Sequence, residues 1–191
     1  MDIREQKRNL RDSISQRISQ IPENKRQAES RSLCKRILDN LPPSPLTIAA
    51  YVPLKSETDI LPLLRKIIER GDNLYLPVFK NNTLTFRSTN TLNDLKPGKL
   101  NIHEPSDCSP ELDPRTLDLA LVPARAFDRE GFRLGRGNGG YDKWIRIQSA
   151  LNPETKFWGI AFECQIVNEV PREEHDEKVD TVITARGIVV P

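Results

Sequence analysis

The chain has 191 residues, of which 29% are charged and 37% hydrophobic, and its formal net charge is +2. This length suits one domain, or two small ones that share a core. The apolar runs are far shorter than the roughly 20 residues that a membrane span needs, and no secretory signal is visible. Three cysteines lie far apart without a CxxC pair, which disfavours a disulfide scaffold and a zinc site. We expect a cytoplasmic protein.

Positive charge is concentrated near the N-terminus. Residues 1–40 carry ten Lys or Arg and six Asp or Glu, whereas the remaining 151 residues have a net charge of −2. A site for an anionic small molecule and a solvated helix face both explain this excess. A nucleic-acid partner is not expected, because residues 1–40 contain no aromatic side chain on which a base could stack.

Two helices are predicted at the N-terminus. Apolar residues spaced by four, four and three positions form the first stripe: Leu10, Ile14, Ile18 and Ile21. Pro22 suits the first turn of the second helix, whose stripe is Cys34, Ile37, Leu38 and Leu41. The proline-rich segment 42–45 then ends the helix.

Strand and helix patterns alternate from residue 46 onwards. A buried strand is predicted over Leu46–Val52, followed by an amphipathic helix over Asp59–Arg70 with Gly71 at its C-terminal cap. Leu74–Phe79 is the second strand, and Leu84–Arg87 is a candidate third strand in a hairpin with it.

The C-terminal half continues the alternation after a long polar connection over residues 91–116. The predicted elements are a strand over Leu117–Pro123, a glycine- and arginine-rich loop, a helix over Gly140–Leu151, and strands over Phe157–Phe162 and Thr181–Thr184. Strands that alternate with helices indicate a mostly parallel sheet covered on both faces. We therefore predict one domain over residues 1–191, an α/β fold with three α/β/α layers and two additional N-terminal helices.

The glycine-rich loop is the most informative segment. Four glycines fall within Gly135–Gly140, directly before a predicted helix. Glycine lets backbone N–H groups approach a ligand closely, and a helix N-terminus favours an anion. Arg133 and Arg136 add full positive charges. This combination indicates a phosphate-binding loop, although a flexible turn is the simpler alternative.

The spacing Gly135-x-Gly137-x-x-Gly140 also matches a dinucleotide-binding fingerprint, which leaves a nicotinamide-dependent enzyme as an alternative. The context disfavours it, because Gly135 lies twelve positions after Pro123 at the end of the predicted strand. The fingerprint requires a tight turn from strand to helix.

Four segments in order resemble the 5-formyltetrahydrofolate cyclo-ligase (methenyltetrahydrofolate synthetase) family. Residues 122–142 match its VP-x-x-AFD-x-x-G-x-RLG-x-G-x-G-x-YD block, and the other segments are Lys7–Arg11, Tyr51–Glu57 and Pro171–Asp180. The resemblance implies a fold like that of NagB, RpiA and the CoA transferases. Many members have an aromatic residue where this chain has Gly140, so a non-catalytic member that binds folate or nucleotide is the alternative.

The family's reaction, as implied by the resemblance, closes a ring in a folate. ATP and Mg²⁺ convert 5-formyltetrahydrofolate to 5,10-methenyltetrahydrofolate through an iminium phosphate, releasing ADP and phosphate. No enzyme nucleophile is required, which agrees with a sequence that has no convincing Ser/His/Asp or Cys/His constellation. The protein must position the reactants and neutralise phosphoryl charge.

Residue roles follow from the same resemblance. Catalytic roles are implied for Lys7 and Arg136. The implied nucleotide-binding residues are Lys7, Arg8, Arg11, Arg133, Leu134, Gly135, Arg136, Gly137, Asn138, Gly139, Gly140 and Tyr141. Val52, Glu57 and Tyr141 are implied to bind the folate, and Asp142 and Asp176 to hold Mg²⁺, with Asp180 as a neighbouring candidate. Glu57 and Asp142 could instead be acids at helix starts, and Tyr141 could pack in the core.

Overall fold

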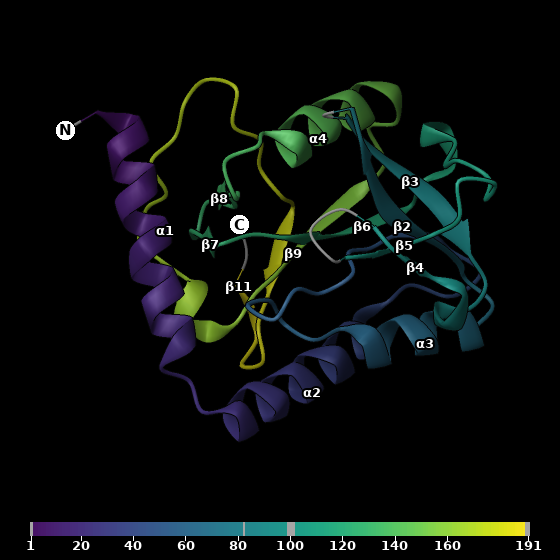
Figure 1. Ribbon diagram of the computed structural model, residues 1–191, viewed down its shortest axis with the longest axis horizontal. Helices are drawn as coiled ribbons and strands as arrows, with labels where there is room; N and C mark the ends of the chain where they lie inside the picture. Colours follow the sequence, from purple (N-terminus) through teal and green to yellow (C-terminus); the bar gives the residue numbers. More distant parts are fainter. Residues whose placement is uncertain (1, 82, 99–101, 190–191) are drawn as a thin grey trace.

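The computed structural model describes residues 2–81, 83–98 and 102–189. A seven-stranded sheet with the order β11-β10-β9-β6-β1-β2-β3 crosses it (Figure 1). Its strands are β1 (Thr47–Ala49), β2 (Asn73–Lys80), β3 (Thr83–Thr89), β6 (Leu119–Pro123), β9 (Lys156–Ile160), β10 (Thr181–Ile183) and β11 (Ile188–Val189). The five inner strands are parallel and the edge strands β3 and β11 antiparallel. The predicted mostly parallel sheet is confirmed.

Helices cover both faces of the sheet, as predicted. The long helices are α1 (Ile3–Ser19), α2 (Glu23–Asn40), α3 (Leu61–Glu69) and α4 (Gly140–Leu151). Helices α2 and α3 lie on one face and α4 on the other (Figure 1). Helix α1 stands at one side of these layers, where its buried Ile14 and Ile18 pack against a small apolar cluster.

Successive side chains of the inner strands point to opposite faces of the sheet, which gives a separate core under the helices of each face. In β1, Ile48 packs with the core under α2 and α3, whereas Ala49 packs with the core under α4. In β6, Leu119 faces the first core and Ala120 the second. Strands buried on both faces therefore appear in the sequence as nearly continuous apolar runs.

The direction of winding reverses at β1. From β1 the chain passes through α3 to β2 on one side, and it later returns to pair β6 with the opposite side of β1. Open α/β sheets bind ligands in the crevice that such a reversal leaves at the carboxyl ends of the strands. The fold thus marks the ends of β1 and β6 as the place to look for a site.

Several predicted boundaries differ from the structure. The first strand ends at Ala49 rather than Val52, because the following residues leave the sheet at its carboxyl end. The connection 91–116 is not wholly irregular: β4 (Lys96–Pro97) pairs with β5 (His103–Glu104), and 3₁₀ turns cover Leu92–Asp94 and Pro114–Thr116. The helix over Gly140–Leu151 and the left-handed Gly71 (φ 84°) are confirmed.

A small hairpin that was not predicted carries the glycine-rich loop. Its strands are β7 (Ala126–Phe127) and β8 (Arg133–Leu134). The buried carboxylate of Asp128 accepts N–H groups from Glu130 at 2.9 Å and from Phe132 and Val170 at 3.0 Å. The carboxylate therefore fixes the turn of the hairpin and ties it to the chain near residue 170.

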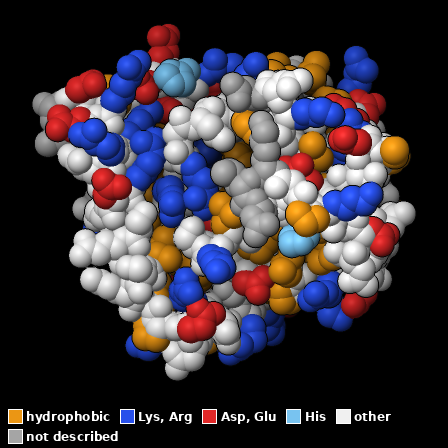
Figure 2. Space-filling model, in the orientation of Figure 1, with side chains coloured by type: hydrophobic (Ala, Val, Ile, Leu, Met, Phe, Trp, Pro, Cys, Tyr) orange, Lys and Arg blue, Asp and Glu red, His pale blue; other side chains and the backbone are white. Residues whose placement is uncertain are grey.

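The surface agrees with the charge distribution of the sequence. Figure 2 shows Lys and Arg side chains gathered on the α1 side of the face drawn. Within the described ranges, no helix has both the length and the apolar character that crossing a membrane requires.

Gly159 in β9 provides a test of the packing between the sheet and the hairpin. A Cβ atom there would lie 2.5 Å from Cε1 of Phe127, which is fully buried. We expect Gly159→Ala to lower the free energy of unfolding by about 1–3 kcal/mol through overpacking, measured by urea denaturation. Gly187→Ala is the matched control, because its Cβ would meet no atom within 4 Å. Equal effects of the two substitutions would contradict this packing.

Candidate active site

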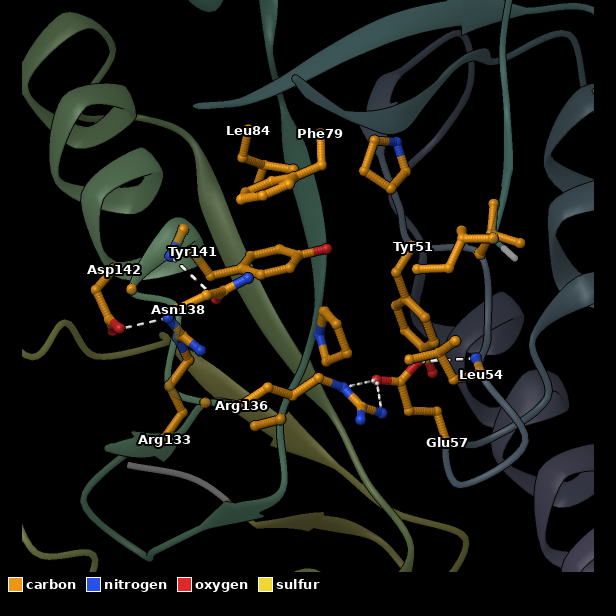
Figure 3. Close-up of a pocket in the computed structure, with 18 of the residues that line it drawn as sticks. Tyr51, Leu54, Glu57, Phe79, Leu84, Arg133, Arg136, Asn138, Tyr141 and Asp142 are labelled. Carbon is orange, nitrogen blue, oxygen red and sulfur yellow. Dashed lines mark hydrogen bonds and ion pairs between the residues drawn. The ribbon is translucent and has the colours of Figure 1, made fainter. Parts of the chain in front are cut away.

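A pocket of about 310 Å³ opens at the carboxyl ends of β1 and β6, where the sheet reverses. One wall follows β1 and includes Tyr51, Val52 and Leu54, while the β2–β3 hairpin adds Phe79 and Leu84 (Figure 3). The opposite wall is the glycine-rich loop and the first turn of α4. The pocket therefore combines an apolar slot with a polar end.

An ion pair forms the polar end of the pocket. The Arg136 guanidinium donates to Oε1 of Glu57 at 2.8 Å and to the Ser56 hydroxyl at 3.2 Å. Oε2 of Glu57 accepts the Leu54 N–H at 2.9 Å, and only 9% of the Glu57 side chain is exposed. Figure 3 shows both side chains at the lower edge of the slot. Glu57 is thus a fixed hydrogen-bond acceptor with a cation beside it.

A second ion pair lies at the start of α4. The buried Arg133 donates to Oδ1 of Asp142 at 2.7 Å, and its guanidinium lies 5.5 Å from the centre of the Tyr141 ring. Burial lowers the pKa of Arg133, and the charge of Asp142 opposes that effect. Burial also raises the pKa of Tyr141 above its usual value. The Tyr141 hydroxyl, which points into the pocket (Figure 3), is therefore a protonated donor at neutral pH.

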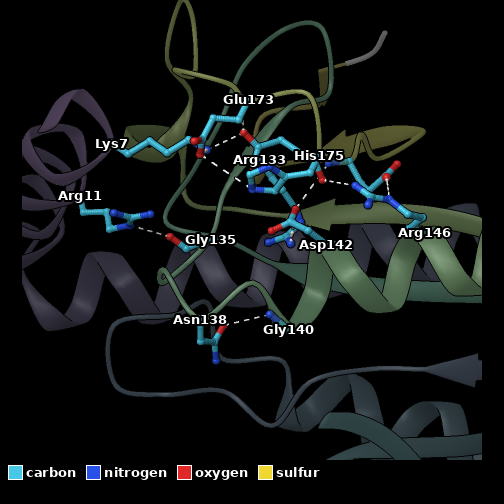
Figure 4. Close-up of polar contacts among 12 residues, drawn as sticks. Lys7, Arg11, Arg133, Gly135, Asn138, Gly140, Asp142, Arg146, Glu173 and His175 are labelled. Carbon is cyan, nitrogen blue, oxygen red and sulfur yellow. Dashed lines mark hydrogen bonds and ion pairs between the residues drawn. The ribbon is translucent and has the colours of Figure 1, made fainter. Parts of the chain in front are cut away.

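The glycine-rich loop packs against α1. Gly137 and Gly139 have φ values of 101° and 65°, which favour glycine. The Arg11 Nε donates to the Gly135 carbonyl at 2.9 Å, and a Cβ on Gly137 would lie 3.6 Å from the Arg11 guanidinium carbon. Arg11 therefore supports the loop from the α1 side (Figure 4).

Lys7 connects α1 to the segment before β10. Its ammonium group lies 2.6 Å from Asp176 and 2.9 Å from Glu173 (Figure 4). Burial alone would lower the pKa of Lys7, but hydrogen bonds to the two carboxylates outweigh burial and raise it. Burial likewise opposes ionisation of Asp176, yet hydrogen bonds from Lys7 and the Glu173 N–H lower the pKa of its carboxyl.

The structure gathers most of the residues singled out in the sequence into one region. The pocket is lined by Val52, Glu57, Arg133, Gly135, Arg136, Asn138, Gly139, Gly140, Tyr141 and Asp142. Gly137 belongs to the loop and lies near Arg11, which bonds to the loop at Gly135. Lys7 pairs with Asp176. Arg8 is exposed on α1, and Leu134 packs in the apolar cluster with Ile14.

Sequence reasoning missed the partners of these groups. Glu173 was not singled out, although an acidic run opposite a basic arm is a usable signal. Phe79 was placed in a strand but not in the site. Its ring lies against Gly140, because a Cβ on Gly140 would come within 3.4 Å of the ring. An aromatic face is therefore present beside position 140, supplied by β2.

The two candidate magnesium ligands each leave one carboxylate oxygen free. Oδ1 of Asp142 is bonded to Arg133 and Oδ2 of Asp176 to Lys7, and the second oxygen of each makes no hydrogen bond to a described residue. No cluster of three His, Cys, Asp or Glu side chains suited to a metal occurs in the described part of the chain. This donor set fits an ion that takes its remaining ligands from phosphate and water.

The sheet and its switch-point pocket define an α/β protein with an arginine-lined ligand site. The model of the 5-formyltetrahydrofolate cyclo-ligase family matches residues 3–185, and the chain belongs to this family of ligases. A relative from Mycolicibacterium smegmatis named 5-formyltetrahydrofolate cyclo-ligase is 33% identical over 192 residues, which cover 96% of each chain. The Escherichia coli protein of that name is 34% identical over 142 residues, covering 72% of this chain and 77% of its own.

Solved structures agree with this assignment. The structure of Aquifex aeolicus 5,10-methenyltetrahydrofolate synthetase matches with a TM-score of 0.82 and 28% identity, covering 95% of this chain and 91% of its own. The synthetase from Mycoplasma pneumoniae, at 20% identity, matches with a TM-score of 0.75 over 97% of this chain and 99% of its own, which shows the shared fold.

The Lys7 contacts predict a pH dependence of stability. The lowered pKa values of Asp176 and Glu173 mean that their contribution is complete above about pH 5 and is lost as the pH falls through the lowered values. The raised pKa of Lys7 means that its contribution is lost only above about pH 10. The difference in unfolding free energy between wild type and Lys7→Met should therefore be largest between these limits and shrink on both sides.

Urea denaturation across this pH range measures that difference. Lys35→Met is the control, because the pair of Lys35 with Asp39 is exposed and such pairs contribute about 0.5 kcal/mol or less. A pH-independent effect of Lys7→Met would contradict the assigned contacts.

Proposed function

We propose that this enzyme cyclises 5-formyltetrahydrofolate to 5,10-methenyltetrahydrofolate with ATP, releasing ADP and phosphate. One observation carries the proposal beyond family membership: an acceptor, Glu57, and a cation, Arg136, meet at the end of an apolar slot beside a glycine-rich loop. A pterin needs the slot and the acceptor, and a transferring phosphoryl group needs the cation and the loop.

The pterin ring lies in the slot in this proposal. Phe79 and Tyr51 are two aromatic residues that line the slot, and Val52 lines the same wall as Tyr51. Glu57 accepts hydrogen bonds from the N–H edge of the pterin, and the Tyr141 hydroxyl donates to the substrate. Both carboxylate oxygens of Glu57 already accept hydrogen bonds, from Arg136 and from the Leu54 N–H, so a ligand N–H group would share or replace these contacts.

The chemistry begins at the formyl oxygen. This oxygen attacks the γ-phosphorus of ATP, and the bond from that phosphorus to the bridging oxygen of ADP breaks. The resulting iminium phosphate carries a carbon far more electrophilic than the original formyl group. N10 of the same folate attacks that carbon and loses its proton, and the carbon–oxygen bond to phosphate breaks. Arg136 and Lys7 stabilise the phosphoryl charge as it transfers.

The nucleotide lies along α1 and the glycine-rich loop. Lys7, Arg8 and Arg11 present cations from α1, and residues 133–141 present Arg133, backbone N–H groups and the N-terminus of α4. A bound Mg²⁺ would supply neutralisation of phosphate charge here. The free oxygens of Asp142 and Asp176 would hold it, with phosphate and water completing its shell.

A non-catalytic binding protein is the second candidate, because Gly140 replaces an aromatic residue. The Phe79 ring lies in the space beside Gly140. The lack of an aromatic side chain at position 140 is therefore weaker support for a non-catalytic protein. We also propose a cytoplasmic location and a single-domain organisation. The three cysteines are free thiols, as is typical of a reducing compartment.

The first test follows turnover by near-ultraviolet absorbance, because ring closure creates a conjugated amidinium. We expect a rise that requires the folate, ATP and Mg²⁺. Arg136→Ala should lower kcat by about 10²–10³, as loss of one well-aimed donor does elsewhere. Arg65→Ala, at an exposed position on α3, is the control. A flat trace from wild type that binds both ligands would favour the non-catalytic alternative.

The second test concerns the aromatic surface of β2. Phe79→Ala should raise the KM for the folate about tenfold, because a stacking contact contributes roughly 1 kcal/mol in addition to the buried area. The KM for ATP should change little, and Phe79→Tyr should retain most of the affinity. An effect on the KM for ATP alone would show that the ring does not contact the pterin.

A further inference from the structure

Arg125 lies beside the polar end of the pocket and has no role in the reaction described so far. Its Nη1 donates to the Ser56 hydroxyl at 3.4 Å, the same oxygen that accepts from Arg136 at 3.2 Å. One hydroxyl group therefore lies between two guanidinium groups. Arg125 has no carboxylate within ion-pair distance among the residues that the structure describes.

The backbone holds Arg125 in this position from both sides. Its N–H donates to the Leu134 carbonyl at 2.7 Å, next to the paired residues Ala126 and Leu134. Its carbonyl accepts from the buried Gln165 side chain at 3.1 Å, and the same amide group donates to the Ala124 carbonyl at 2.8 Å. Arg125 thus begins the hairpin whose other end leads into Gly135 and Arg136.

The surrounding charge is unbalanced. Burial lowers the pKa of Arg125, and the positive charges of Arg136 and Arg11 lower it further, while Glu57 raises it. Two guanidinium groups and one carboxylate therefore act on Arg125, and that carboxylate is already bonded to Arg136. A bound anion would relieve the repulsion among these groups.

We propose that Arg125 is a further phosphate-binding residue of this site, acting with Arg136 across Ser56 on the phosphate chain of the nucleotide. The proposal rests on the proposed function for the identity of the nucleotide. A guanidinium binds phosphate oxygens bidentately. Arg125 and Arg136 contact the same Ser56 hydroxyl, so a phosphate group that reaches Arg136 would also lie close to Arg125.

Calorimetric titration of a non-hydrolysable ATP analogue with Mg²⁺ tests this role directly. We expect Arg125→Gln to weaken binding of the analogue by about 10- to 100-fold, as for loss of a charged hydrogen bond. Arg125→Lys should recover part of the affinity. Arg129→Gln is the matched control, because Arg129 is an exposed arginine in the same hairpin.

A carboxylate of the folate tail is the alternative source of the anion, and a second titration distinguishes it. Binding of 5-formyltetrahydrofolate is compared with binding of 5-formyltetrahydropteroate, which lacks the glutamate. If Arg125→Gln weakened binding of 5-formyltetrahydrofolate but not of 5-formyltetrahydropteroate or the ATP analogue, the proposal would be overturned. Arg125 would then be assigned to the glutamate tail. The proposal would also be overturned if Arg125→Gln changed the affinity for the ATP analogue no more than Arg129→Gln does.

Thermal unfolding separates a binding role from a structural one. Without ligand, Arg125→Gln should unfold at the wild-type temperature or above it, because a like-charge contact has been removed. It should gain less stabilisation from the ATP analogue than wild type does. Equal loss of affinity for both ligands together with a lower unfolding temperature would overturn the proposal. If wild type bound the analogue but showed no turnover, the proposed function would be contradicted. The affinities of the variants for the analogue could still be compared, because that measurement does not require turnover.

Discussion

The buried carboxylate of Asp128 holds together the part of the chain from which the site is built. It accepts three backbone N–H groups, two from its own turn and one from Val170. The hairpin it closes presents Arg125 at one end and the glycine-rich loop at the other. The contact with Val170 also fixes the start of the segment that carries Glu173 and Asp176. A single side chain in the AFD sequence thus sets the relative positions of the loop and the acidic segment.

Three ion pairs hold most of the charged side chains of the site, with Arg125 as an exception among the described residues. Arg136 pairs with Glu57, Arg133 with Asp142, and Lys7 with Asp176. Each pair joins two different elements, so the ion pairs also connect α1, the β1 end, the loop and the acidic segment. In the proposed reaction, ligands with complementary groups exchange partners with these pairs. Such an exchange costs less than exposing an unpaired buried charge.

The helices and the inner strands could be predicted from the sequence. Helix α4 and the left-handed Gly71 were predicted correctly because periodicity and capping are local properties. The β7–β8 hairpin was missed because strands of two residues show no alternation, and its stability comes from Asp128 and from packing under α1.

The residues of the site were recognised from the sequence, but their contacts were not. The pairing of Lys7 with Glu173 joins positions far apart in the chain, and no local pattern encodes such a contact. Phe79 was assigned to its strand correctly. Its position beside Gly140 depends on how the β2–β3 hairpin lies over α4, which is a property of the packed layers.

The way helix α1 is attached affects how the two reactants are positioned. It lies outside the three layers and is held by a small apolar cluster, by Lys7 and by Arg11. The slot, in contrast, is built on the sheet itself. In the proposed function the two reactants are therefore held by separate bodies, the nucleotide partly by a docked helix and the folate by the rigid scaffold. The geometry between the reacting atoms is then only as exact as the docking of one helix.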